Sequence, residues 1–133
     1  WLHEGFILRE KDFRENLKAF DWNQFSNRGV ALFCSTDAIL PAWTFALITS
    51  HLFPFAKQIV HGNRLSYLLV HYTGVLNLID YTLYQDKPLI LKGCSKKDVP
   101  QEIYTLAIQK ICPFAKSIMF GEACSAVPLF KSK

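Results

Sequence analysis

Three of the four cysteines share a local pattern, in which a short apolar run comes before the thiol and a serine follows it. These residues are Cys34, Cys94 and Cys124. Thiolates are natural ligands for zinc and for iron–sulfur clusters, so three thiols brought to one place would suit a metal. The spacings match no standard zinc motif and include no Cys-x-x-Cys pair. Whether the three thiols meet therefore depends on the fold.

The fourth ligand is left open by the sequence. It could come from Asp37, His61, Glu122, solvent or a partner protein. Asp37 is the favoured carboxylate, either as a ligand or as a group that orients the site, and it is equally suited to cap the next helix. Among the histidines only His61 is weakly favoured, and we expect His51 at the surface. We expect Cys112 late in a helix, as a small core residue.

Two other kinds of function remain open. Cys34 is expected at a strand-to-helix turn, where a thiol could act as a nucleophile or redox group in a transfer enzyme. The 11 Phe, 5 Tyr and 3 Trp are more aromatic residues than a small core must hide, which favours an adaptor or a self-associating domain. No glycine-rich phosphate loop or other standard catalytic motif is present.

Short apolar runs alternate with helical periodicity along the whole chain. The runs predict strands at about 30–33, 58–60, 89–91, 117–120 and 127–130, and helices at about 10–19, 41–52, 65–76 and 100–111. We expect the strands at 30–33 and 89–91 to be buried, the helix at 41–52 to be buried on nearly all sides, and 21–28 to be a loop. The alternation predicts an α/β fold, a mostly parallel sheet with flanking helices.

An internal repeat supports this fold. Residues 52–59 align with 111–118, and the same register matches Pro41 with Pro100 and Gly62 with Gly121. A gap of one residue in the preceding loop then aligns Cys34 with Cys94. We therefore expect two similar βαβ units, at about 29–62 and 88–121. Because parallel strands end at one edge of a sheet, the three cysteines are predicted along that edge.

Length and composition bound the possibilities further. The chain has 133 residues, 15.3 kDa and 50% apolar residues, which fits one domain over 1–133. The longest uncharged stretch, 38–56, is interrupted by Pro41 and Pro54, so no membrane span is expected. A net charge of +4, scattered along the chain, does not favour nucleic-acid binding. Without a visible secretory signal, the four cysteines suggest reduced thiols in a cytoplasm.

Four segments of the chain carry a resemblance to a known family. They are residues 6–14, 34–41, 92–94 and 117–125. Together they resemble the bacterial family called domain of unknown function 2480, over nearly the whole chain, although Ala123 stands where a proline is usual. The family has no established activity, so the resemblance names no catalytic residue. It implies an additional segment before Trp1, which agrees with the missing initiator Met.

The same resemblance bears on cofactor and partners. Family members are often encoded near genes for sulfur mobilisation, which implies iron–sulfur assembly proteins as partners and favours an iron–sulfur cluster over zinc. Together with the cysteine pattern, this predicts a small cytoplasmic metal- or iron–sulfur-binding accessory module. Cys34, Cys94 and Cys124 are its expected ligands, with Asp37 beside them. A homo-oligomer is the further partner expected from the aromatic content.

Overall fold

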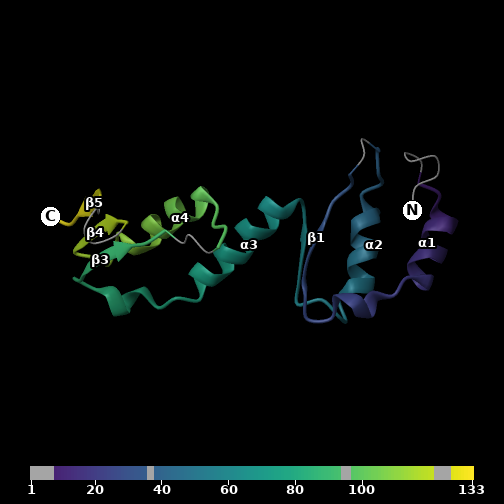
Figure 1. Cartoon of the computed structure of the whole chain (residues 1–133), viewed down its shortest axis with the longest axis horizontal. Coiled ribbons are helices and arrows are strands. Elements are labelled where there is room, and N and C mark those ends of the chain that lie inside the picture. The colour runs from purple at the N-terminus through teal and green to yellow at the C-terminus, as the bar shows by residue number, and fades with distance from the viewer. Residues whose placement is uncertain (1–7, 36–37, 94–96, 122–126) are drawn as a thin grey trace. The chain divides into compact units, whose positions relative to one another are not determined.

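Helices and strands alternate along the chain in the computed structural model (Figure 1). The structure describes residues 8–35, 38–93, 97–121 and 127–133. The chain divides into two compact units, unit 1 ending at Tyr67 and unit 2 beginning at Leu68. Each unit contains a strand, a helix and a second strand parallel to the first, so the expected α/β class is confirmed.

Unit 1 combines two helices with a two-stranded sheet. In chain order its elements are α1 (Glu10–Ala19), the 3-10 helix η1 (Trp22–Phe25), β1 (Gly29–Leu32), α2 (Trp43–Leu52) and β2 (Gln58–His61). The strands are parallel, with Gly29 opposite Gln58 and Leu32 opposite His61. The first turn of α3 (Arg64–Asn77) also belongs to this unit. A Cβ atom at Gly29 would overlap the Tyr67 ring, so this turn of α3 packs against the start of β1.

The core of unit 1 forms where the apolar stripe of α1 meets α2 and η1. Phe13, Leu17, Trp22 and Leu52 are buried together. The Trp22 indole N–H donates to the Leu17 carbonyl at 2.8 Å, which satisfies the polar end of a buried ring. Phe13 and Leu17, four residues apart, form the buried stripe of α1, and the helix predicted at about 10–19 is confirmed.

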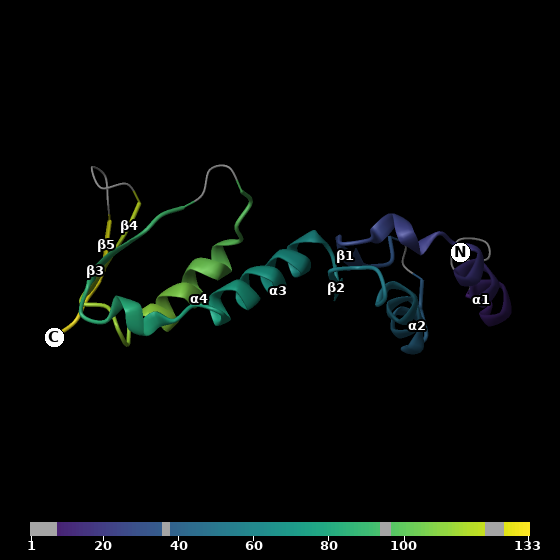
Figure 2. The ribbon, with the colours of Figure 1, turned by 90° about the horizontal axis from the view of Figure 1, so that it is seen from below.

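Unit 2 contains a three-stranded mixed sheet. After the rest of α3 come η2 (Tyr81–Tyr84), β3 (Pro88–Leu91), α4 (Gln101–Ile111), β4 (Ser117–Phe120) and β5 (Val127–Lys131). β3 and β4 are parallel, and β5 returns antiparallel beside β4 (Figure 2). Pro128 lies at a register shift opposite Met119, on the edge strand β5, where the missing N–H is tolerated.

The sheet arrangement differs from the expectation in one respect. A single, mostly parallel sheet was predicted, whereas the described strands form a parallel pair and a separate mixed sheet of three strands. The parallel pairs are those joined through a helix, as the alternating pattern requires. The antiparallel strand follows a connection too short to contain a crossover helix.

Several local expectations are also corrected. The segment 21–28 contains η1 instead of a loop, because the Asp21 side chain accepts from the Asn23 N–H at 3.0 Å and caps a helical turn. Of the residues in α2 only Thr44 and Leu52 are buried, so this apolar helix is not covered on all sides. The strand expected at 30–33 ends at Leu32, and Phe33 beyond it is 58% exposed. In β3 the residues Pro88 and Ile90 are exposed, so this strand is half-buried.

The same backbone contacts occur in both units at positions 59 residues apart. The Asn27 N–H donates to Phe55 O at 3.0 Å, and the Asp86 N–H donates to Phe114 O at 2.8 Å. Both donors have a positive φ, 60° and 58°. Each unit also closes its parallel pair with a glycine N–H, from Gly62 to Leu32 O in unit 1 and from Gly121 to Leu91 O in unit 2.

Candidate thiol site

Two of the predicted thiols belong to segments that continue from neighbouring strands of unit 2. β3 ends at Leu91 and β4 ends at Phe120, and these two residues are directly paired. The chain then leads into residues 94–96 and 122–126, which carry Cys94 and Cys124 and lie outside the described residues. The two strands that lead toward these segments therefore end at the same edge of one sheet.

A third strand end lies at the same edge. β5 begins at Val127, which is paired with Phe120 across the antiparallel ladder. Cys124 belongs to the connection between these two paired residues. Gly93, the last described residue before Cys94, would place a Cβ within ordinary contact distance of Phe120, 3.6 Å from its ring. The chain before Cys94 and the chain on both sides of Cys124 therefore meet this sheet at the same edge.

Cys34 lies at the corresponding position of unit 1. It follows the end of β1 by two residues and is half-buried. At an offset of 59 residues its counterpart in unit 2 is Gly93, and Cys94 comes one residue later, which is the gap found in the sequence alignment. Asp37 lies outside the described residues. Of the four predicted metal-site residues, the structure therefore describes only Cys34.

The fourth cysteine, Cys112, lies at the end of a helix as predicted, but it is half-buried and not the core residue that was expected. Cys112 is the C-cap of α4, is half-buried, and donates its backbone N–H to Ile108 O at 2.9 Å. Its counterpart Phe53 caps α2 with the same bond, to Thr49 O at 2.8 Å. Cys112 therefore has a structural position that a phenylalanine occupies in the other unit.

The described histidines make ring contacts. His61, at the end of β2, lies with its ring centroid 4.3 Å from that of Phe45. His51 was expected at the surface but is half-buried, with its ring stacked on Trp22 at 5.5 Å. Among the residues that the structure describes, no three His, Cys, Asp or Glu side chains are grouped closely enough to hold a metal ion.

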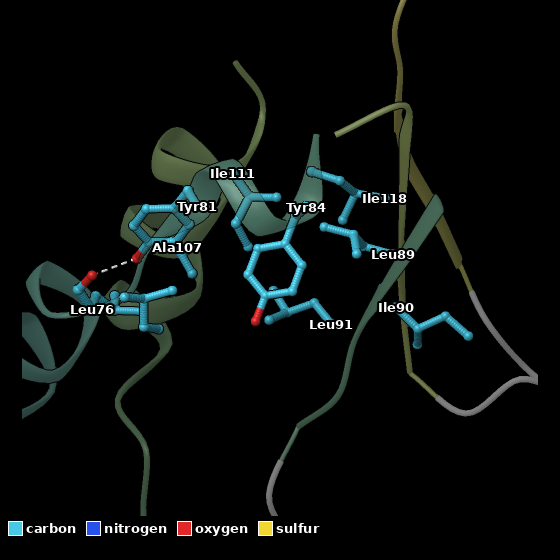
Figure 3. Close-up of a pocket in the computed structure, with 10 residues that line it drawn as sticks. Leu76, Tyr81, Tyr84, Leu89, Ile90, Leu91, Ala107, Ile111 and Ile118 are labelled. Atoms are coloured by element: carbon cyan, nitrogen blue, oxygen red, sulfur yellow. Dashed lines mark hydrogen bonds between the residues drawn. The ribbon is translucent and has the colours of Figure 1, made fainter. Parts of the chain in front are cut away.

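An apolar cavity in unit 2 was not predicted. It has a volume of about 230 Å³ and lies between η2, β3 and α4 (Figure 3). Leucine and isoleucine side chains form most of its wall, with Tyr81 and Tyr84 beside them. The Tyr81 hydroxyl donates to Leu76 O at 2.6 Å, and burial, together with the nearby Tyr84, raises the pKa of Tyr81. The phenol is therefore neutral at physiological pH and cannot act as a base.

Unit 1 has a cavity at the equivalent place, of about 300 Å³. Trp22 and Phe25 replace Tyr81 and Tyr84 in its wall. The sequence carries a common signal for both cavities, an Asp followed one and four residues later by an aromatic residue. The two sets are Asp21, Trp22 and Phe25, and Asp80, Tyr81 and Tyr84. An apolar wall without a charged or nucleophilic group can bind apolar surface but offers no catalytic chemistry.

Comparisons with known proteins agree with the resemblance seen in the sequence. In the described residues, no helix combines the length and the apolar composition needed to cross a membrane. Comparison with curated proteins and with solved structures gives no match. The model of one protein family, described as protein of unknown function (DUF2480), matches residues 1–132. The chain therefore belongs to the DUF2480 family.

Proposed function

We propose that this protein is a cytoplasmic accessory module that binds a metal ion or an iron–sulfur cluster through cysteine thiolates. The observation that supports this is the pairing of Leu91 with Phe120, from which the segments bearing Cys94 and Cys124 both continue. Cys34 is the third proposed ligand, and Asp37 is the proposed fourth ligand or orienting group. The proposed partners are iron–sulfur assembly proteins.

The chemistry of the thiols favours a cluster or zinc over a hard cation. Thiolate sulfur is a soft ligand, whereas Mg²⁺ and Ca²⁺ prefer oxygen. Strand ends are rigid attachment points, and backbone N–H groups near them can donate to sulfur and tune a cluster. When Asp37 orients the site without binding the metal, three protein ligands leave one coordination position open, which suits transfer to a partner better than permanent structural binding.

We also propose that the two strand–helix–strand units arose by duplication. Three observations support this: the equal offset of the hydrogen bonds at Asn27 and Asp86, the glycine bonds that end both parallel pairs, and the matching cavities. The equivalence extends upstream of the strands, since Tyr81 donates to Leu76 O as Trp22 donates to Leu17 O. Under this proposal, Cys34 and Cys94 are within one residue of equivalent sequence positions.

Single Cys→Ser variants test the metal proposal directly. The full chain is purified without oxygen, reconstituted with iron and sulfide or with zinc, and assayed for bound metal per chain. We expect Cys94→Ser and Cys124→Ser to lose most of the bound metal and Cys34→Ser to lower it. Cys112→Ser is the matched control, because Cys112 caps a helix in a place where Phe53 serves equally well. Equal metal content in all four variants would contradict the proposal.

A further inference from the structure

In the described part of the chain, the outer edge of β2 carries no further strand, unlike the equivalent edge in unit 2. Among the described residues β2 pairs with β1 alone, whereas β4, which occupies the equivalent place, has β5 on its far side. The chain after β2 turns into α3 at Arg64, while the chain after β4 returns as an antiparallel strand. Unit 2 therefore shows what kind of segment fits this edge.

The backbone groups at this edge can be assigned from the ladder. The Gly62 N–H donates to Leu32 O at 2.8 Å, toward β1. Because successive residues of a strand direct their N–H and C=O groups to opposite sides, Ile59 and His61 direct theirs to the outer edge. In unit 2 the equivalent residues are Ile118 and Phe120, and both are paired with β5.

Apart from its short length, β2 lacks the features that protect exposed strand edges. Lysine, proline and bulges commonly prevent edge-to-edge association. β5, one of the two edge strands of unit 2, has all three, in Lys131, Pro128 and the register shift opposite Met119. β2 is Gln-Ile-Val-His and has no charged carboxylate, lysine or proline. An edge of this composition suits a strand that is paired in the assembled protein.

We propose that a second copy of this chain covers this edge, with the two β2 strands antiparallel about a two-fold axis. Unit 2 shows an antiparallel strand at the equivalent edge. A two-fold axis perpendicular to the sheet makes two identical edge strands antiparallel and closes the assembly as a dimer. The result is a four-stranded sheet in the order β1, β2, β2 of the second copy and β1 of the second copy.

The pairing register follows from the side-chain alternation. Residues opposite each other must lie on the same face, so odd-numbered positions pair with odd and even with even. Satisfying the outward groups of Ile59 and His61 places Ile59 opposite His61 of the second copy, with Val60 opposite Val60 at the centre. This register sets Lys57 opposite Asn63, so it brings no like charges together.

A disulfide at the centre of the proposed interface tests the register. Val60 falls in a non-hydrogen-bonded pair, where Cα atoms are about 4.5 Å apart, a distance that a disulfide spans. We expect Val60→Cys in the full chain to form a covalent dimer on mild oxidation, with the position-60 thiols joined as mapped by mass spectrometry. Ala31→Cys is the matched control, since Ala31 is the β1 partner of Val60 and lies one strand away from the interface.

Sedimentation over a range of concentrations tests the dimer without cross-linking. His61→Pro removes an outward N–H at an exposed position, and we expect it to raise the dimer dissociation constant at least tenfold. His61→Ala keeps the N–H and should change the constant less than threefold, and circular dichroism checks that both variants are folded. A wild-type chain that stays monomeric at every concentration, or equal cross-linking of Val60→Cys and Ala31→Cys, would overturn the proposal. Neither outcome depends on bound metal, so the test is independent of the thiol proposal.

Discussion

Two aromatic residues, Trp22 and Tyr81, occupy equivalent positions in the two units and make the same kind of hydrogen bond. Each ring lies against a cavity wall, and its polar atom donates to a carbonyl five residues earlier, Leu17 O or Leu76 O. A buried N–H or O–H without an acceptor would cost free energy. These hydrogen bonds therefore allow a ring with one polar atom to pack against apolar side chains. The residue type differs between the units, but the hydrogen-bonding task is the same.

The raised pKa of Tyr81 predicts how unfolding responds to alkaline pH. The folded state holds the Tyr81 proton more tightly than the unfolded state does. In the unfolded state tyrosine ionises at about pH 10. This contribution to stability is therefore complete below about pH 10 and is lost as the pH rises through the folded pKa. We expect Tyr81→Phe to lower the free energy of unfolding by about 1 kcal/mol at pH 7. Urea unfolding between neutral pH and pH 11 measures both effects.

The variant should also lose less stability than the wild type between pH 10 and 11, because its side chain has no proton to release. Trp22→Phe is the matched control, since it removes the equivalent hydrogen bond without removing a titrating group. Identical alkaline slopes for wild type and Tyr81→Phe would show that burial of this phenol does not contribute to stability.

At the scale of elements, equivalent helix positions differ in burial. Leu17 in α1 is 0% exposed, whereas Leu76, its counterpart in α3, is half-buried and belongs to a helix with no fully buried residue. Large-to-small substitutions cost most where the surroundings cannot relax into the space left. The same leucine-to-alanine change therefore has different expected costs in the two helices.

We expect Leu17→Ala to lower the free energy of unfolding by about 2–5 kcal/mol, because it opens a cavity in a closed core. Leu76→Ala should cost only about 1 kcal/mol, since its side chain already borders an open cavity and solvent. Chemical denaturation of both variants measures the difference. Equal losses at the two positions would mean that Leu76 is as deeply buried in solution as Leu17.

Most elements could be predicted because their signal is local. The helices α1 and α4 and the short strand β2 lie close to the predicted ranges, because hydrophobic spacing and short apolar runs are local signals. The prediction for α2 was wrong about burial, because a mostly apolar sequence does not show how many of a helix's faces a small unit covers. The helix η1 was missed because its cap is a single side chain, Asp21, whose effect outweighs the polar composition around it.

At the scale of the whole molecule, the sequence indicates which strands are parallel but not which strands share a sheet. The helix between β3 and β4 requires a parallel pair, and that pair brings the ends at Leu91 and Phe120 together. The alternation of strands and helices did not reveal that β1 and β2 form a sheet of their own. Such a local pattern does not show which strands far apart in the sequence pair with each other. For the candidate site, the strand ends were predictable from topology. The geometry of the ligands could not be predicted, because the cysteines lie in connecting segments whose sequences have no hydrophobic periodicity.

The central claim is that thiolate sulfur binds a metal in this protein, and metal-edge X-ray absorption of the anaerobically purified full chain tests it most directly. The expected spectrum shows sulfur neighbours at about 2.3 Å, the distance of a thiolate ligand. An additional metal–metal shell would identify a cluster, and its absence would identify a single ion such as zinc. A chain that holds no metal, or a metal with only oxygen and nitrogen neighbours, would contradict the claim.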